Sequence, residues 1–225
     1  MDFIVEKISE DSFYINLLVG LPQLLVLIET MGINEYNLVR FPPVSEPEII
    51  QWEHKHGVTL PEDLHDFYSS INGFLYEWFY DFKGNRRNLG KVEVNSLENL
   101  KQIFGYVTTS EPGISKKDQI WEIKLSLESK VFEICSVSGG KVVLVYLFPK
   151  LEPSVWFFTC VMDFCYLSKD FKTYLKMCIA HVGIPNWQFA FTPEGISEWT
   201  KNHELVKKQT QLKYQRKPLY YIKKH

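Results

Sequence analysis

The chain has 225 residues and a formal net charge of −2, and 45% of its residues are hydrophobic and 15% aromatic. This apolar content excludes an intrinsically disordered protein, and the length suits one large domain or a domain with extensions. The charge is unevenly spread, because residues 201–225 hold eight Lys or Arg and one acid, Glu204, against 17 basic and 26 acidic residues before them. The body therefore carries about −9 and the tail about +7, which suggests that the tail meets an acidic partner.

The first part of the chain is predicted to be helical and then extended. Residues 12–30 fit two helical pieces that separate at Pro22, and residues 34–43 fit an extended segment that stops at Pro42-Pro43. The first eleven residues carry acids where a secretory signal needs basic residues, and the longest apolar stretch, 15–28, is too short to span a bilayer. We therefore expect a cytoplasmic protein that does not insert into a membrane.

Two short helices joined by a tight connection are predicted next. The first spans residues 45–56, begins with a Ser45–Glu48 capping box, places Trp52 on an inward face and ends at Gly57. The second begins at Pro61, whose missing N–H costs nothing in a first turn, and stops at Asn72-Gly73. Its inward face is defined by 3.6-residue spacing: Leu64, Phe67, Tyr68 and Ile71.

The periodicity then changes to that of strands, with residues 84–88 as a turn and Ser138-Gly139-Gly140 as a hairpin turn. Residues 96–104 fit a short helix capped by Ser96, and residues 107–120 fit a polar loop. The expected strands are 73–82, 89–97, 130–137, 141–148 and 154–161. A helix over 169–182, an aromatic loop over 186–197, a short helix from Ser197 and the basic tail complete the chain.

This order predicts an α+β fold, with an antiparallel or mixed sheet covered by helices on one side. The expected organisation is a single domain over residues 1–205, with an N-terminal helical extension, and a basic tail over 206–225.

No pattern in the sequence predicts catalysis, a cofactor or a metal site. Gly139-Gly140-Lys141 lacks the earlier Gly, the following Ser or Thr and the helix of a phosphate loop, so a hairpin turn is the better interpretation. His54 and His56 fall on different helix faces, and no zinc-binding helix motif is present. The four cysteines lie in apolar segments without CxxC spacing and are expected to be buried free thiols: Cys135, Cys160, Cys165 and Cys178. We therefore expect a protein that is not an enzyme.

The segment over residues 42–74 resembles the signature of the SUKH superfamily, to which the yeast cell-wall assembly regulator and many bacterial immunity proteins belong. The matching residues are Ile49, Trp52, Leu60, Pro61, Glu62, Asp63, Phe67, Tyr68, Asn72, Gly73 and Phe74. The resemblance implies a SUKH-like α+β fold with an N-terminal helical hairpin, a sheet of about six strands and closing C-terminal helices.

A narrower resemblance extends past this motif, to a family of subunits of tubulin polyglutamylase complexes. It is carried by residues 139–142, 145–146, 155–158 and 181–197, the last of which contain the unusual run PNWQFAFT. The resemblance implies a non-catalytic adaptor subunit at microtubules and the centriole or basal body. Its partners would be other complex subunits, including a tubulin-tyrosine-ligase-like enzyme, and tubulin itself. The alternative is a stand-alone SUKH-type binding module that acts like an immunity protein.

Two segments are candidate partner-binding sites. Trp187, Phe189 and Phe191 either seal one end of the core or form an exposed aromatic patch, since aromatic residues concentrate in interface hot spots. The basic tail is either a solvated end or a segment that attracts acidic tubulin tails. No motif that reads nucleic acid accompanies it, so we expect no nucleic-acid partner. Its candidate residues are Lys207, Lys208, Lys213, Arg216, Lys217, Lys223 and Lys224.

Overall fold

The computed structural model describes residues 33–82, 84–105, 125–181 and 183–196, with residues 123 and 200. The predicted helices over 12–30, the loop over 107–120, the short helix from Ser197 and the basic tail lie outside the described residues.

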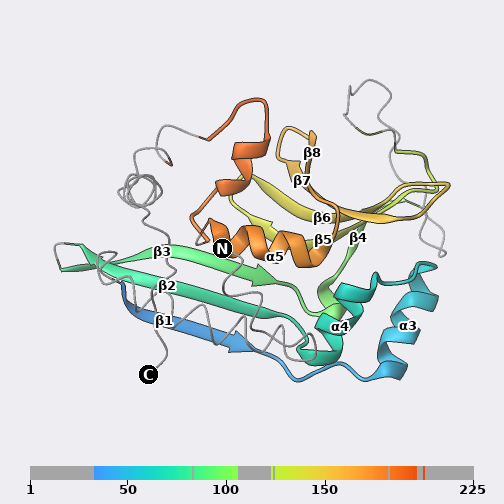
Figure 1. Ribbon diagram of the computed structural model, residues 1–225, viewed down its shortest axis with the longest axis horizontal. Coiled ribbons are helices and arrows are strands. Elements are labelled where there is room, and N and C mark those ends of the chain that lie inside the picture. Colours follow the sequence, from blue (N-terminus) through green and yellow to red (C-terminus); the bar gives the residue numbers. More distant parts are fainter. Residues whose placement is uncertain are drawn as a thin grey trace, which may run out of the picture.

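The described residues form two antiparallel sheets and three α-helices (Figure 1). The three-stranded sheet has the order β1-β2-β3, and its strands are β1 Ile33–Arg40, β2 Phe74–Phe82 and β3 Asn85–Val94. The five-stranded sheet has the order β4-β5-β6-β7-β8, and its strands are β4 Gln102–Phe104, β5 Lys130–Val137, β6 Gly140–Tyr146, β7 Pro153–Thr159 and β8 Phe164–Ser168. The helices are α3 Glu46–His56, α4 Glu62–Ser70 and α5 Phe171–Ala180, with short 3₁₀ turns η3 Leu97–Asn99 and η4 Trp187–Phe191. The α+β prediction is confirmed, whereas the single sheet of about six strands is replaced by these two sheets.

The main core lies between the two sheets, where α5 is seen in Figure 1. Because side chains alternate along a strand, Val142, Leu144 and Tyr146 of β6 join this core. Val143 and Val145 point to the other face and join a second apolar cluster with Trp156. The five-stranded sheet is therefore apolar on both faces, which explains why β6 is a continuous apolar run in the sequence.

The first two described helices begin and end largely as predicted. At the start of α3 the Glu48 carboxylate accepts from both the backbone N–H (2.9 Å) and the hydroxyl (2.6 Å) of Ser45. Gly57 ends the helix with φ of 59°, a conformation that glycine adopts without a steric penalty. The end of α4 differs from the prediction, because its C-cap is the extended residue Ile71, and the left-handed φ of 80° falls at Gly73.

The start of β3 was predicted wrongly, and two short strands, β4 and β8, were missed. β3 begins at Asn85, so residues 85–88 of the predicted turn belong to a strand. The predicted helix over 96–104 is only the 3₁₀ turn η3, followed by β4. β8 was not predicted at all, because it is only five residues long and follows a tight turn in which Thr159 accepts from the N–H of Asp163 (3.0 Å).

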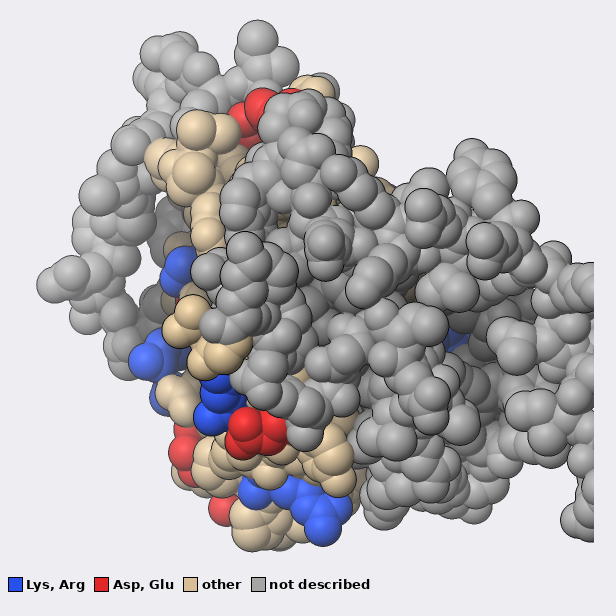
Figure 2. All heavy atoms as spheres, turned by 90° about the vertical axis from the view of Figure 1, so that its left-hand side faces the viewer, with Lys and Arg blue, Asp and Glu red and all other residues tan. Residues whose placement is uncertain are grey.

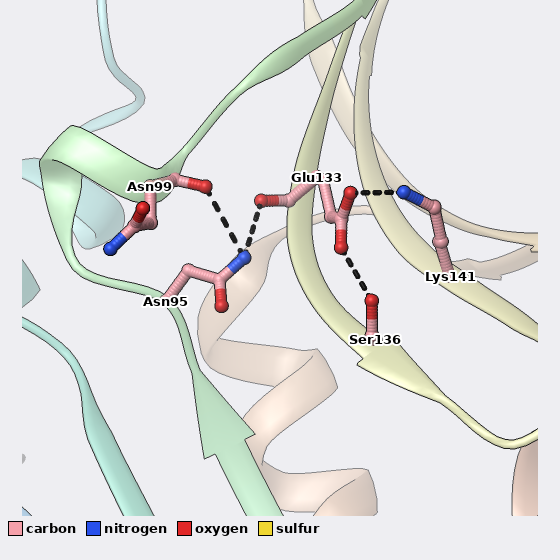
Figure 3. A network of polar contacts seen from close by, with 5 residues as sticks. All are labelled: Asn95, Asn99, Glu133, Ser136 and Lys141. Carbon is pink, nitrogen blue, oxygen red and sulfur yellow. Dashed lines mark hydrogen bonds and ion pairs between the residues drawn. The ribbon is translucent and has the colours of Figure 1, made fainter.

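A polar network joins the end of β3 to β5 (Figure 3). The side-chain amide of Asn95 donates to the backbone carbonyls of Asn99 (3.3 Å) and Glu133 (3.2 Å). The backbone N–H of Asn95 donates to the carbonyl of Ile134 (2.8 Å). The Glu133 side chain, in turn, accepts from Lys141 and from the Ser136 hydroxyl (2.6 Å). Burial alone would raise the pKa of Glu133. The two hydrogen bonds, together with the positive charges of Lys141 and Lys101, outweigh burial and lower the pKa, so the carboxylate stays charged.

Candidate protein-interaction site

The segment that carries PNWQFAF begins where α5 ends. His181 is the C-cap of α5, and Gly183 follows with φ of 53°. The Gly183 carbonyl accepts from the N–H of Lys91 on β3 (2.9 Å), and a side chain at Gly183 would clash with the buried indole of Trp78. A glycine is therefore required here by conformation and by space, and it fixes where the aromatic segment starts.

Trp187 anchors the segment in the protein. Its indole is 3% exposed and stacks on the His181 ring, with 4.5 Å between ring centroids and 8° between planes. Tyr174 of α5 lies behind it at 6.1 Å. This burial agrees with the core-sealing interpretation for Trp187.

Phe189 lies over the hairpin turn between β5 and β6. Its ring packs edge-on against Phe157, with centroids 5.0 Å apart. A Cβ built on Gly139 would lie only 2.8 Å from the Phe189 ring, so the turn must stay small for the ring to fit. The Gly139 carbonyl also accepts from the N–H of Cys160 (2.9 Å), which brings the β7–β8 turn to the same place. The structure thus brings together two segments about 50 residues apart that the sequence had suggested separately.

Phe191 faces outward. Its side chain is 41% exposed and lies edge-on to Trp187, with centroids 6.0 Å apart. Val161, in the β7–β8 turn that joins Phe189 through Gly139, is 62% exposed. We call His181, Trp187, Phe189 and Phe191 the aromatic corner: it has a buried anchor, a packed middle and an exposed end. That arrangement is typical of a surface that presents a rigid aromatic side chain to a partner.

Two of the four cysteine thiols are buried in surroundings that disfavour the thiolate. Burial raises the pKa of the Cys135 thiol to about 12 and also raises the pKa of Cys178, so both are protonated at neutral pH and are poor nucleophiles. Cys165 is buried too, but Cys160 is exposed, so the prediction that all four cysteines are buried is wrong for Cys160. Among the described residues, no three His, Cys, Asp or Glu side chains lie close enough to hold a metal ion.

A shallow cavity of about 460 Å³ opens beside α3, lined in part by Ile50, Glu53 and Tyr146. Two polar side chains of its lining, those of Glu53 and Tyr146, already have partners within the fold. Glu53 accepts from the N–H of Leu60 (2.7 Å), and the Tyr146 hydroxyl donates to the carbonyl of Thr59 (2.9 Å). These groups hold the α3–α4 connection in place, which is a structural task.

Charged side chains of both signs lie on one end of the molecule. On the end of the molecule shown in Figure 2, Lys and Arg side chains are interspersed with Asp and Glu, and neither sign dominates. Within the described ranges, every helix is too short or too polar to span a lipid bilayer. The candidate basic residues from Lys207 to Lys224 lie outside the described residues, and their role stays a prediction.

Sequence patterns alone did not connect His181, Gly139 or Val161 with the PNWQFAF segment, and they indicated only a hairpin turn at Gly139-Gly140. The adjacent glycines were a usable signal, because a hairpin tip without side chains leaves room for a ring from elsewhere.

Comparison with known proteins gives three relatives, each named tubulin polyglutamylase complex subunit 2. The proteins of Rattus norvegicus and Mus musculus are each 28% identical over 194 residues, and that of Homo sapiens is 29% identical over 193 residues. Each alignment covers 78% of this chain and 66%, 66% and 64% of the respective relative, so the chain spans slightly less than two thirds of their length. No solved structure matches the chain significantly.

The comparison with protein families gives one match, over residues 43–177. This range includes α3, α4, both sheets from β2 onward and most of α5. It covers more than half of the chain and contains the helix pair that first suggested the superfamily. The chain therefore belongs to the SMI1 / KNR4 family (SUKH-1).

Proposed function

We propose that this protein is a non-catalytic regulatory or adaptor subunit of a tubulin polyglutamylase complex. In that role it assembles a tubulin-tyrosine-ligase-like glutamylase or targets it to microtubules, in the cytoplasm and at the centriole or basal body. The observation that carries the proposal is the similarity, over 78% of the chain, to proteins named as subunit 2 of such a complex.

The aromatic corner supports a binding role. Phe191 is exposed while the rings of Trp187 and His181 pack against it, so a partner meets a side chain that loses little conformational freedom on binding. The raised pKa of Cys135 and the engaged groups of the α3 cavity are consistent with a subunit that leaves catalysis to another chain.

The proposed organisation is a single domain over residues 1–205 followed by a basic tail over 206–225. The domain would contact other subunits, and the tail would add an electrostatic attraction to acidic tubulin tails.

The experiment is recovery of complex subunits with the tagged full-length protein from ciliated cells, analysed by mass spectrometry. The test variant is Phe191→Ser, and the matched control is Phe148→Ser, because Phe148 is 47% exposed on a different part of the molecule. We expect both variants to melt like the wild type. Recovery of the tubulin-ligase-like enzyme should fall severalfold for Phe191→Ser and stay unchanged for the control.

Wild-type protein that recovers no tubulin-ligase-like enzyme would overturn the proposal. Specific recovery of a toxin would instead support the second candidate, a stand-alone SUKH-type binding module, which the family match over residues 43–177 favours. Equal recovery of the enzyme by both variants would support membership of the complex but would show that the aromatic corner is not part of the interface.

A further inference from the structure

The strand β1 lies at the edge of the three-stranded sheet. Among the described residues it pairs with β2 alone, so its other side has no strand neighbour. An unpaired strand edge presents backbone N–H and C=O groups that can accept another strand. The available stretch runs from Glu35 to Phe41, because a register irregularity precedes Glu35 and Pro42-Pro43 follows Phe41.

This edge has only part of the usual protection against association. Protected edges carry lysines, inward-pointing charges or prolines, or are very short. Residues 35–41 contain no lysine, and their only charged residues are Glu35 and Arg40. Ten large hydrophobic side chains are strongly exposed in the described residues, and three of them lie within this stretch: Tyr36 at 52%, Val39 at 40% and Phe41 at 52%. Tyr36 and Val39 lie on opposite faces of the strand, so exposed apolar side chains border this edge on both faces.

The two faces of β1 differ in which side chains are available to a partner. The register with β2 places Tyr36, Leu38 and Arg40 on the core side, opposite Trp78, Tyr76 and Phe74. On the other face, Glu35 is already paired with Arg86 at 3.0 Å. Arg40 is exposed and, within the part of the chain that the structure describes, forms no ion pair. The core-side face therefore has an unmatched cation at one end and an exposed aromatic ring at the other.

These features make the strand complementary to itself. Residues that face each other in an antiparallel pair lie on the same side of the sheet. Two copies of β1 related by a twofold axis at Leu38 would place Tyr36 opposite Arg40 of the second copy, and Arg40 opposite its Tyr36. Each copy would then supply the cation that lies over the aromatic ring of the other. A register centred on Asn37 would instead leave both arginines without an aromatic partner.

We propose that the free edge of β1 is a strand-addition site, and that its occupant is β1 of a second copy of this chain. The result is a symmetric dimer with a continuous six-stranded sheet in the order β3-β2-β1-β1-β2-β3. Seven residues of strand pairing form a small interface, so the dimer is concentration-dependent and not permanent.

The test is the mass of the purified full-length chain by sedimentation velocity, from roughly 1 µM to roughly 500 µM. We expect the mass to approach twice that of the monomer at the upper end. Tyr36→Lys would place a lysine opposite Arg40 of the second copy and should lower the association constant at least tenfold. Adding Arg40→Glu to that variant creates opposite charges in the same register and should restore association. Leu127→Lys is the matched control, because Leu127 is also 52% exposed but lies away from β1.

Hydrogen exchange of the wild-type chain provides a second readout that needs no variant. Exchange in a peptide covering residues 33–41 should slow as concentration rises, while exchange in α5 should not change. The proposal is overturned by a chain that stays monomeric over the whole range, by a dimer insensitive to Tyr36→Lys, by failure of the double variant to restore association, or by exchange in β1 that ignores concentration.

Discussion

Trp52 shows how single aromatic side chains join a helix to a sheet in this protein. The indole is 7% exposed, and its ring lies 4.3 Å from His56 on the same helix and 5.0 Å from Phe132 on β5. The sequence predicted its burial from helical spacing alone, and the structure confirms it. Spacing could not predict the partner, because Phe132 lies 80 residues further along the chain.

Replacing Trp52 with Ala should lower the free energy of unfolding by about 3–5 kcal/mol, because the large cavity left against Phe132 can be filled only partly. Ile50→Ala on the same helix is the control, since Ile50 is 43% exposed and should cost less than about 1 kcal/mol. Denaturant titration followed by circular dichroism measures both values. Equal costs for the two variants would contradict the assignment of Trp52 to the core.

At the scale of elements, α4 and α5 are held together by a carboxylate. The N–H of Lys172, in the first turn of α5, donates to Oδ2 of Asp63 in the first turn of α4 (2.7 Å). The rings of Phe67 and Phe171 pack edge-on beside this contact at 5.0 Å. Burial raises the pKa of Asp63, and the hydrogen bond from Lys172 offsets only part of that rise. The Asp63 carboxylate therefore accepts a hydrogen bond at the start of α5, but its buried surroundings favour the protonated, neutral carboxyl.

A pH dependence follows from this raised pKa. Because the folded-state pKa of Asp63 lies above the unfolded value, its contribution to stability is greatest below the unfolded pKa, near 4, and is lost as pH rises through the folded pKa. Asp63→Asn keeps an oxygen acceptor but cannot ionise. Its melting temperature relative to wild type should therefore rise as the pH increases from about 4 toward neutral. Thermal melts of both proteins across that range measure the difference, and a constant offset would contradict the assignment.

The elements that were predicted poorly depend on contacts with other segments, which local sequence patterns do not contain. Arg86 made the start of β3 look like a turn, yet its guanidinium lies 3.9 Å over the Phe79 ring on a solvent-facing side of the sheet, where a charged residue fits well. β8 and η4 depend on contacts with distant segments, and local patterns do not contain those contacts. For the same reason the aromatic alternation in PNWQFAF was visible in the sequence, whereas the separation into a buried Trp187 and an exposed Phe191 was not.

At the scale of the whole molecule, the net charge is positive over residues 201–225 and negative over the rest of the chain. We expect truncation after Glu204 to leave the fold and complex assembly intact while weakening association with microtubules at low salt. The attraction should fade as the Debye length falls from ~10 Å at 0.1 M salt to ~3 Å at 1 M. Co-sedimentation with microtubules at two salt concentrations measures this effect.

A full-length variant with Tyr214→Ser and Tyr220→Ser is the control, because it keeps all seven basic residues that the truncation removes. It should bind like the wild type. Equal binding by the truncated chain, or binding that persists in high salt, would show that the tail does not act through charge.

The order of strands in the two sheets also has a consequence for how the protein is made. In both sheets the neighbours in space are neighbours in chain order, from β1 to β3 and from β4 to β8. As the chain leaves the ribosome, each strand after the first of its sheet therefore finds a partner already outside, and β1 and β4 wait only for the next strand of the chain. The core is sealed late in synthesis, because the sealing contacts involve residues near the C-terminal end of the fold. The Gly183 carbonyl must accept from the N–H of Lys91, and the Phe189 ring must pack over Gly139. A nascent chain that stops before residue 183 would lack the contacts that seal its core, and we expect such a chain to need chaperones until translation continues.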